Sequence, residues 1–91
     1  MLYEIKRTNA FKRELKNIRK RGLDMAELDF VVDALASGKV LPSKYCDHAL
    51  KGKWRGSREC HVAPDWLLIY KIKANVLVLT LQRTGTHSDL F

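Results

Sequence analysis

The chain has 91 residues, of which 46% are hydrophobic and 30% are charged, a balance typical of a globular domain rather than a disordered tail. A chain of this length builds one small core, so we expect a single domain over residues 1–91. Its apolar runs are far shorter than the ~20 residues that span a membrane, and residues 1–16 lack the apolar stretch of a secretory signal. Two cysteines provide no disulfide framework, which favours a reduced, cytoplasmic protein.

The net charge of +7 is unevenly distributed. Residues 1–23 carry eight basic and two acidic side chains, a net of +6, whereas residues 24–50 carry two basic and five acidic ones, a net of −3. Residues 51–91 carry seven basic and three acidic side chains, a net of +4. A small basic domain favours a polyanionic partner, first of all nucleic acid, with an acidic protein or a membrane surface as alternatives.

The first quarter of the chain predicts a short strand and a helix. Residues 2–6 alternate weakly between polar and apolar, as a strand does. Thr8 or Asn9 can cap the helix that follows, because a short side-chain oxygen accepts a hydrogen bond from an early N–H group. Gly22 can adopt the left-handed backbone conformation that commonly ends a helix. The spacing of the apolar residues predicts one buried stripe, formed by Phe11, Leu15 and Ile18.

A second helix is predicted directly after the first. Asp24 and Glu27 have the spacing of a capping box, and Gly38 ends the helical pattern. Its apolar face contains Met25, Leu28, Val31, Val32 and Leu35. Two helices joined by a tight glycine turn indicate an antiparallel hairpin.

The second half of the chain predicts three strands. Pro42 breaks the helical region, and residues 43–53 form a polar loop. Strands are expected over residues 54–62, 66–73 and 76–83, with a turn at 63–65 and a polar tail at 84–91. The predicted fold is therefore an α+β domain of order β-α-α-β-β-β, with a helical hairpin on one face of a mostly antiparallel sheet. The opposite face of the sheet is expected to be free to carry a site.

All three histidines lie outside the predicted helices. His48 is in the polar loop, His61 is near the end of a strand, and His87 is in the tail. The turn at 63–65 places His61 and Asp65 at one rim of the sheet. Imidazole exchanges protons near neutral pH, and a neighbouring carboxylate can fix its tautomer or act as a base.

Basic side chains close to these residues can hold a phosphate and stabilise negative charge in the transition state. Those of the loop are Lys51, Lys53 and Arg55. Together with the histidines they match metal-independent RNA cleavage, in which the 2′-hydroxyl attacks phosphorus. DNA lacks that hydroxyl and would not be cut.

These residues also have structural interpretations. A lone histidine is usually a solvated polar residue, and Asp65 in a Pro-Asp sequence is more often a turn former. The tryptophans and Tyr70 can stack on bases, but on strands they are more often core residues. Zinc sites contain close ligand pairs that this sequence lacks, and adjacent Cys60 and His61 point to opposite faces of a strand. We therefore expect no metal site and no cofactor.

Two segments resemble the YafQ-type toxins of the RelE superfamily. They are DHALKGKWRGSRECHVAPDWLLIY at residues 47–70 and QRTGTHSDLF at residues 82–91. The resemblance covers nearly the whole chain, is tight over residues 45–91 and is looser through the helices.

The resemblance implies a microbial ribonuclease-like fold of order β-α-α-β-β-β and a toxin of a type II toxin–antitoxin pair. Such toxins enter the decoding site of the ribosome and cut messenger RNA without a metal. It further implies a small antitoxin partner with a ribbon-helix-helix DNA-binding part, similar to DinJ or RelB. The pair would form a two-plus-two heterotetramer that binds operator DNA.

The resemblance also implies an acid–base set. His87 is the expected proton donor to the leaving oxygen, and Asp65 or His48 the expected acceptor of the 2′-hydroxyl proton. His61 would orient the phosphate. Two further residues are implied to contact substrate, Arg83 at the phosphate and Phe91 at the bases.

Two other functions remain open at this point. The chain can be a basic module that blocks translation or binds DNA without cutting, or a gyrase-directed toxin of the same superfamily. The appearance of cleaved message when the protein is made alone distinguishes a ribonuclease toxin from both of these alternatives.

Overall fold

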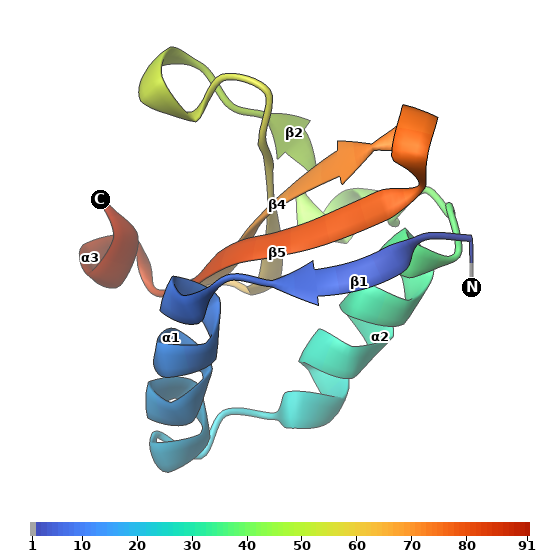
Figure 1. Cartoon of the computed structure of the whole chain (residues 1–91). Helices are drawn as coiled ribbons and strands as arrows, with labels where there is room; N and C mark the ends of the chain where they lie inside the picture. The colour runs from blue at the N-terminus through green and yellow to red at the C-terminus, as the bar shows by residue number, and fades with distance from the viewer. Residues whose placement is uncertain (1) are drawn as a thin grey trace.

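The computed structural model describes residues 2–91, and it confirms the predicted α+β class. Five strands form one sheet in the order β1-β5-β4-β3-β2 (Figure 1). β1 runs parallel to β5, and the other neighbours are antiparallel. The strands are β1 (Glu4–Arg7), β2 (His48–Ala49), β3 (Arg58–Ala63), β4 (Trp66–Lys73) and β5 (Val78–Gly85). The helices are α1 (Asn9–Lys20), α2 (Met25–Ala36) and α3 (His87–Leu90), and short 3-10 turns occupy η1 (Ser43–Tyr45), η2 (Gly52–Trp54) and η3 (Ala74–Val76).

The two long helices begin at the expected capping residues. The hydroxyl of Thr8 accepts a hydrogen bond from the N–H of Phe11 at 3.0 Å. Asp24 caps α2 by accepting from the N–H of Ala26 at 3.0 Å. Gly22, with a φ of 76°, provides the left-handed turn between the helices.

Both helices pack on the same face of the sheet and form the main core with it. The apolar stripe predicted for α1 is buried, and α2 contributes Leu28, Val31 and Leu35. The sheet supplies the other side of this core through Cys60, Val62, Leu68, Tyr70, Leu79 and Leu81. Each large apolar side chain buried here contributes about 1.5–3 kcal/mol to folding.

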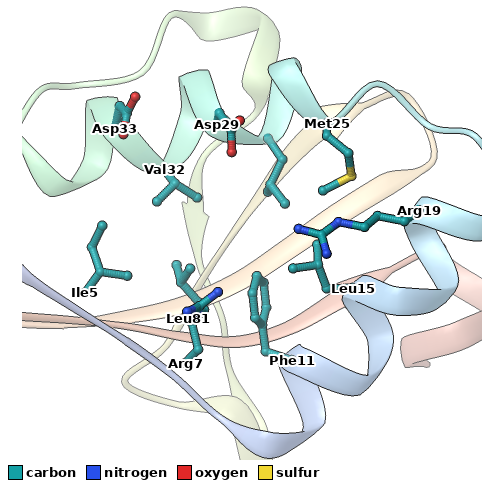
Figure 2. Close-up of a pocket in the computed structure, with 11 residues that line it drawn as sticks. Ile5, Arg7, Phe11, Leu15, Arg19, Met25, Asp29, Val32, Asp33 and Leu81 are labelled. Atoms are coloured by element: carbon teal, nitrogen blue, oxygen red, sulfur yellow. The ribbon is translucent and has the colours of Figure 1, made fainter.

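The helices do not close into the tight hairpin that the glycine turn indicated. They diverge from the turn, α1 lying against β5 and α2 against β3 (Figure 1). A hollow of about 370 Å³ remains between them. Phe11 and Leu81 are among the apolar side chains that line it, Arg19 extends across it from α1, and Asp29 and Asp33 lie along α2 (Figure 2).

Several predicted boundaries in the second half are wrong. The strand expected from residue 54 begins at Arg58, because η2 and a turn occupy the preceding residues. The strand expected at 76–83 runs from Val78 to Gly85, since η3 takes up residues 74–76. The polar loop predicted at 43–53 contains η1, β2 and the start of η2, and the polar tail predicted at 84–91 contains the end of β5 and α3.

The face of the sheet opposite the long helices is partly covered, contrary to expectation. Leu67, Ile69 and Leu90 form a second small core there, against which Leu50 and Trp54 pack. The terminal helix α3 is thereby fastened to the sheet. Among residues 2–91, no helix has the length and apolar character needed to cross a membrane.

Candidate active site

Strand register brings the three histidines together on the second face of the sheet. His48 in β2 lies directly opposite Glu59 in β3, so their side chains share a face. His61 follows two residues after Glu59 and points to the same side. Across the sheet, His61 pairs with Leu67 and Leu67 pairs with Gly85, which places His87 just beyond the end of the same row.

Glu59 lies between two imidazoles. Its Oε1 is 3.6 Å from Nε2 of His61 and 3.8 Å from Nε2 of His48. The rings of His61 and His87 meet edge to face, with their centres 5.8 Å apart. We call His48, Glu59, His61 and His87 the histidine cluster.

Asp65 holds His87 by two hydrogen bonds. The Nδ1–H group of His87 donates to Oδ1 of Asp65 at 2.7 Å, and the backbone N–H of His87 donates to the same oxygen at 3.2 Å. These bonds hold the pKa of Asp65 below its ordinary value, the side-chain bond having the largest effect. With Nδ1 bound to a carboxylate, Nε2 is the nitrogen of His87 that remains available for proton transfer.

The tautomer of His48 is set by the backbone. Its Nδ1 lies 2.7 Å from the carbonyl oxygen of Cys46, and since a carbonyl only accepts, Nδ1 carries the proton. Nε2 of neutral His48 therefore bears a lone pair. The loop that carries this histidine is anchored through Asp47, whose carboxylate accepts from the Tyr70 hydroxyl and from Nε of Arg58.

Glu59 is the site residue that the candidate set omitted. Its carboxylate is only 6% exposed, although it forms no part of the apolar core. The alternation of β3 places Glu59 and His61 on one face, and that pattern was the signal that could have identified it.

Glu59 also belongs to a potential metal-ligand set. One ligand atom from each of Glu59, His61 and His87 lies within 4.8 Å of the other two, and we call these three residues the ligand triad. Two imidazoles and a carboxylate suit zinc or copper. The ligand triad was not among the sequence predictions, because these considered cysteine and histidine pairs and not the carboxylate of Glu59, which lies two residues before His61 on the same face of β3.

The expected substrate-contacting residues fall into two groups. Lys51, Lys53 and Arg55 are exposed on and beside η2, in the loop that projects from the sheet away from α1 and α2 (Figure 1). Phe91 is 62% exposed directly after α3. Arg83, in contrast, is engaged by Glu14 of α1 through contacts of 2.6–3.0 Å.

The aromatic side chains considered for base stacking belong mainly to the interior. Trp66 and Tyr70 are buried in the main core. Trp54 packs against the second core. Phe91 is therefore the aromatic residue near the cluster with an exposed ring.

Comparison with known proteins identifies the family of this chain. The family model described as "Bacterial toxin of type II toxin-antitoxin system, YafQ" matches residues 3–91. The mRNA interferase toxin YafQ of Escherichia coli K12 is 39% identical over 89 residues, which are 97% of this chain and 95% of that protein.

Two solved structures illustrate the similarity of the fold. The E. coli DinJ-YafQ complex contains a chain with a TM-score of 0.90 and 39% identity, covering 98% of both chains. A metal-bound toxin from Helicobacter pylori has a TM-score of 0.92 and 45% identity over 100% of both chains. This chain therefore belongs to the YafQ family of bacterial toxins of type II toxin–antitoxin systems.

Proposed function

We propose that this chain is an endoribonuclease that cuts messenger RNA by metal-independent acid–base catalysis. The observation that carries the proposal is the placement of His87, whose Nδ1 is anchored on Asp65 at 2.7 Å while its ring lies edge to face against that of His61. An imidazole held in this way can deliver a proton to a leaving oxygen. The name of the E. coli relative, an mRNA interferase toxin, supports the same activity.

The reaction begins at the 2′-hydroxyl of RNA. Nε2 of His48 takes the hydroxyl proton, and the 2′-oxygen forms a bond to phosphorus. The bond from phosphorus to the 5′-oxygen breaks, and that oxygen takes the proton from Nε2 of His87. The products are a 2′,3′-cyclic phosphate and a free 5′-hydroxyl, and a net transfer of one proton from His87 to His48 balances the step.

The remaining residues stabilise charge during this step. His48 becomes an imidazolium as it accepts the proton, and the Glu59 carboxylate at 3.8 Å stabilises that cation. His61 is placed to orient the phosphate, and Asp65 holds the tautomer of His87 rather than acting as the base. Lys51, Lys53 and Arg55 supply positive charge for the RNA backbone, and Phe91 an exposed ring for a base.

We further infer that the chain acts as a single domain in the cytoplasm, on messages held by the ribosome. Its net charge of +7 supports association with ribonucleoprotein. The decoding site would supply further groups that align the message, so that the isolated toxin needs only the proton-transfer residues.

A cognate antitoxin is the second partner we propose. A YafQ chain of E. coli has been solved in a DinJ-YafQ complex. By analogy this chain would bind a ribbon-helix-helix antitoxin, as a heterotetramer that also contacts operator DNA. The hollow between α1 and α2 can receive apolar side chains of the antitoxin, while Arg19 on one rim and Asp29 and Asp33 on the other pair with its charges (Figure 2).

The decisive experiment on the activity is primer extension on a reporter message after induction of the toxin without antitoxin. We expect in-frame cuts with the wild type and none with His87→Ala, because loss of a general acid costs about 10²–10⁴-fold in rate. Lys39→Ala, an exposed change beyond α2, is the matched control and should cut normally.

Other outcomes would reject the proposal. Growth arrest with intact message would indicate a non-cutting inhibitor of translation. DNA breaks with intact message would indicate a gyrase-directed toxin. Full cleavage by His87→Ala would remove the assigned role of this histidine.

The antitoxin site can be tested separately by co-purification with the cognate antitoxin. Arg19→Glu reverses a charge on the rim of the hollow and should weaken the complex, whereas Lys20→Glu, the neighbouring reversal, should not. Equal binding by both variants would place the antitoxin elsewhere.

A further inference from the structure

His87 is carried by a helix that cannot be stable alone. α3 has four residues, and so short a helix depends on contacts outside itself. A capping box closes its start: the Asp89 N–H donates to the Thr86 hydroxyl at 3.2 Å, and the Thr86 N–H donates to the Asp89 carboxylate at 2.9 Å. Leu90 is buried in the second core. These contacts, together with the two hydrogen bonds from His87 to Asp65, hold the helix to the sheet, and a further restraint comes from a distant part of the chain.

Arg21, the residue that directly follows α1 and caps its end, supplies this restraint from 68 residues away in the chain. Nη1 of Arg21 donates to Oδ2 of Asp89 at 2.8 Å, and Nη2 donates to Oδ1 at 3.2 Å. The guanidinium thus binds both oxygens of the carboxylate, a geometry that fixes orientation as well as distance. The guanidinium, followed by the cap, holds the pKa of Asp89 well below its ordinary value.

A second ion pair ties α1 to the other side of His87. Glu14 accepts from Nη2 of Arg83 at 2.6 Å, and also from the N–H of Thr84 at 3.2 Å. Glu14 and Arg21 are seven residues apart, which places them on the same face of the helix. The chain is therefore held by α1 at residues 83–84, before His87, and at residue 89, after it.

Close packing at Gly85 makes this arrangement possible. A Cβ atom at this position would lie 2.9 Å from both Cβ and Oδ2 of Asp89. A glycine therefore allows the carboxylate to approach the end of β5 while it binds Arg21.

We propose that Arg21 and Glu14 are positioning residues that set the placement of His87 through this two-point brace from α1. The proposal rests on the proposed function, since it assigns His87 to proton transfer. Asp65 fixes the tautomer of His87, but both side chains are largely exposed, so this one contact does not set the position of the ring over the sheet by itself. That position also depends on the backbone that carries His87, and a small misplacement of a catalytic group costs up to about 100-fold in rate.

The test compares Arg21→Gln with Lys20→Gln. Lys20→Gln removes one positive charge from the last turn of α1, and Arg21→Gln removes one from the residue that follows it. Lys20 has no ion pair within residues 2–91, whereas Arg21 binds Asp89. Single-turnover cleavage of a ribosome-bound message should slow about 10-fold in Arg21→Gln at saturating ribosome complex, with little change in the half-saturating concentration. Lys20→Gln should match the wild type in the saturating rate, and Arg21→Lys, which keeps the charge but not the fork, should fall between.

A second measurement does not depend on activity. The placement of the His87 ring is followed by proton NMR, through nuclear Overhauser effects between the ring protons of His87 and those of His61, whose ring centres lie 5.8 Å apart. In Arg21→Gln we expect these effects to weaken, because the backbone that carries His87 loses one of its two attachments to α1. Lys20→Gln should leave them unchanged, and Asp89→Asn, which removes the carboxylate bound by Arg21, should weaken them as Arg21→Gln does.

The outcomes separate the two proposals. Unchanged effects between the His87 and His61 rings in Arg21→Gln overturn the brace. An equal loss of rate in Arg21→Gln and Lys20→Gln also overturns it, because it would mean that this end of α1 contributes only charge. A wild type that does not cut RNA refutes the proposed nuclease, while the NMR comparison still decides whether α1 positions His87.

Discussion

Replacing the buried carboxylate of the histidine cluster tests the electrostatic part of the mechanism. Glu59→Gln keeps the size of the side chain and removes its charge. At 3.8 Å, a full positive charge on His48 is stabilised by about 1 kcal/mol in water and about 4 kcal/mol at the effective dielectric constant near 20 typical of protein surfaces. At 1.36 kcal/mol per tenfold change, those limits correspond to about 5-fold and about 1,000-fold in rate.

The exposure of Glu59 and His48 narrows the range of rate losses expected for Glu59→Gln. Glu59 is buried, but the side chain of His48 is 50% exposed, so water screens the pair. The proton is also only partly transferred in the transition state. We therefore expect a loss of about 10- to 100-fold.

The assay is single-turnover cleavage of a ribosome-bound message, with thermal unfolding measured on the same preparations. Asp33→Asn, an exposed carboxylate on α2, is the matched control and should leave the rate unchanged. At a pH where the neighbouring imidazoles are neutral, the melting temperature of Glu59→Gln should stay close to that of the wild type, because a neutral amide of the same shape costs less to bury than a carboxylate. Cleavage at the wild-type rate by Glu59→Gln would refute the assignment of this carboxylate to the mechanism.

Three further predictions concern stability and metal binding. Thr84→Val removes a buried hydroxyl that accepts from Nε1 of Trp66 and donates to the carbonyl of Leu67, both at 2.9 Å. In urea titrations it should reduce the free energy of unfolding by about 2–4 kcal/mol, and a loss below about 1 kcal/mol would contradict the role of this buried network. Asp65 and Asp89 have pKa values below the ordinary 3.8, so the stability they provide is complete above the unfolded-state value and is lost as pH falls through their folded-state values. Urea midpoints measured from pH 5 to pH 2 should fall on acidification, and less steeply for Asp89→Asn; identical slopes would argue against the Arg21 pair as a source of stability. Micromolar copper or zinc should inhibit cleavage by occupying the imidazole nitrogens of the ligand triad. A chelator selective for these metals should leave the untreated enzyme fully active, and loss of activity with that chelator would instead indicate a required metal.

Local sequence patterns determined most of the secondary structure. The four- and three-residue spacing of Phe11, Leu15 and Ile18 corresponds to the buried face of α1. Thr8 and Asp24 cap the two long helices because their side-chain oxygens accept hydrogen bonds from backbone N–H groups of the first turn. Such features depend on a few consecutive residues, so they can be inferred without a tertiary structure. The short turns η2 and η3 were missed because three-residue elements have no periodicity to detect.

The chemistry of the candidate residues was also accessible from the sequence. Three histidines outside the helices, with Asp65 beside a turn, indicated acid–base chemistry. The resemblance of residues 47–70 and 82–91 to a toxin family indicated the same residues, and the family itself is confirmed by the comparisons. Their individual roles remain proposals.

Tertiary structure alone decided how these residues meet. Glu59 became a central carboxylate only because β2 pairs with β3 in a register that sets His48 opposite it. His87 reaches Asp65 because antiparallel pairing returns β5 to the turn between β3 and β4. Arg21 binds Asp89, which lies 68 residues further along the chain, and no local pattern encodes that contact. The packing of α1 on β5 brings these two residues together, and their spacing along the sequence does not.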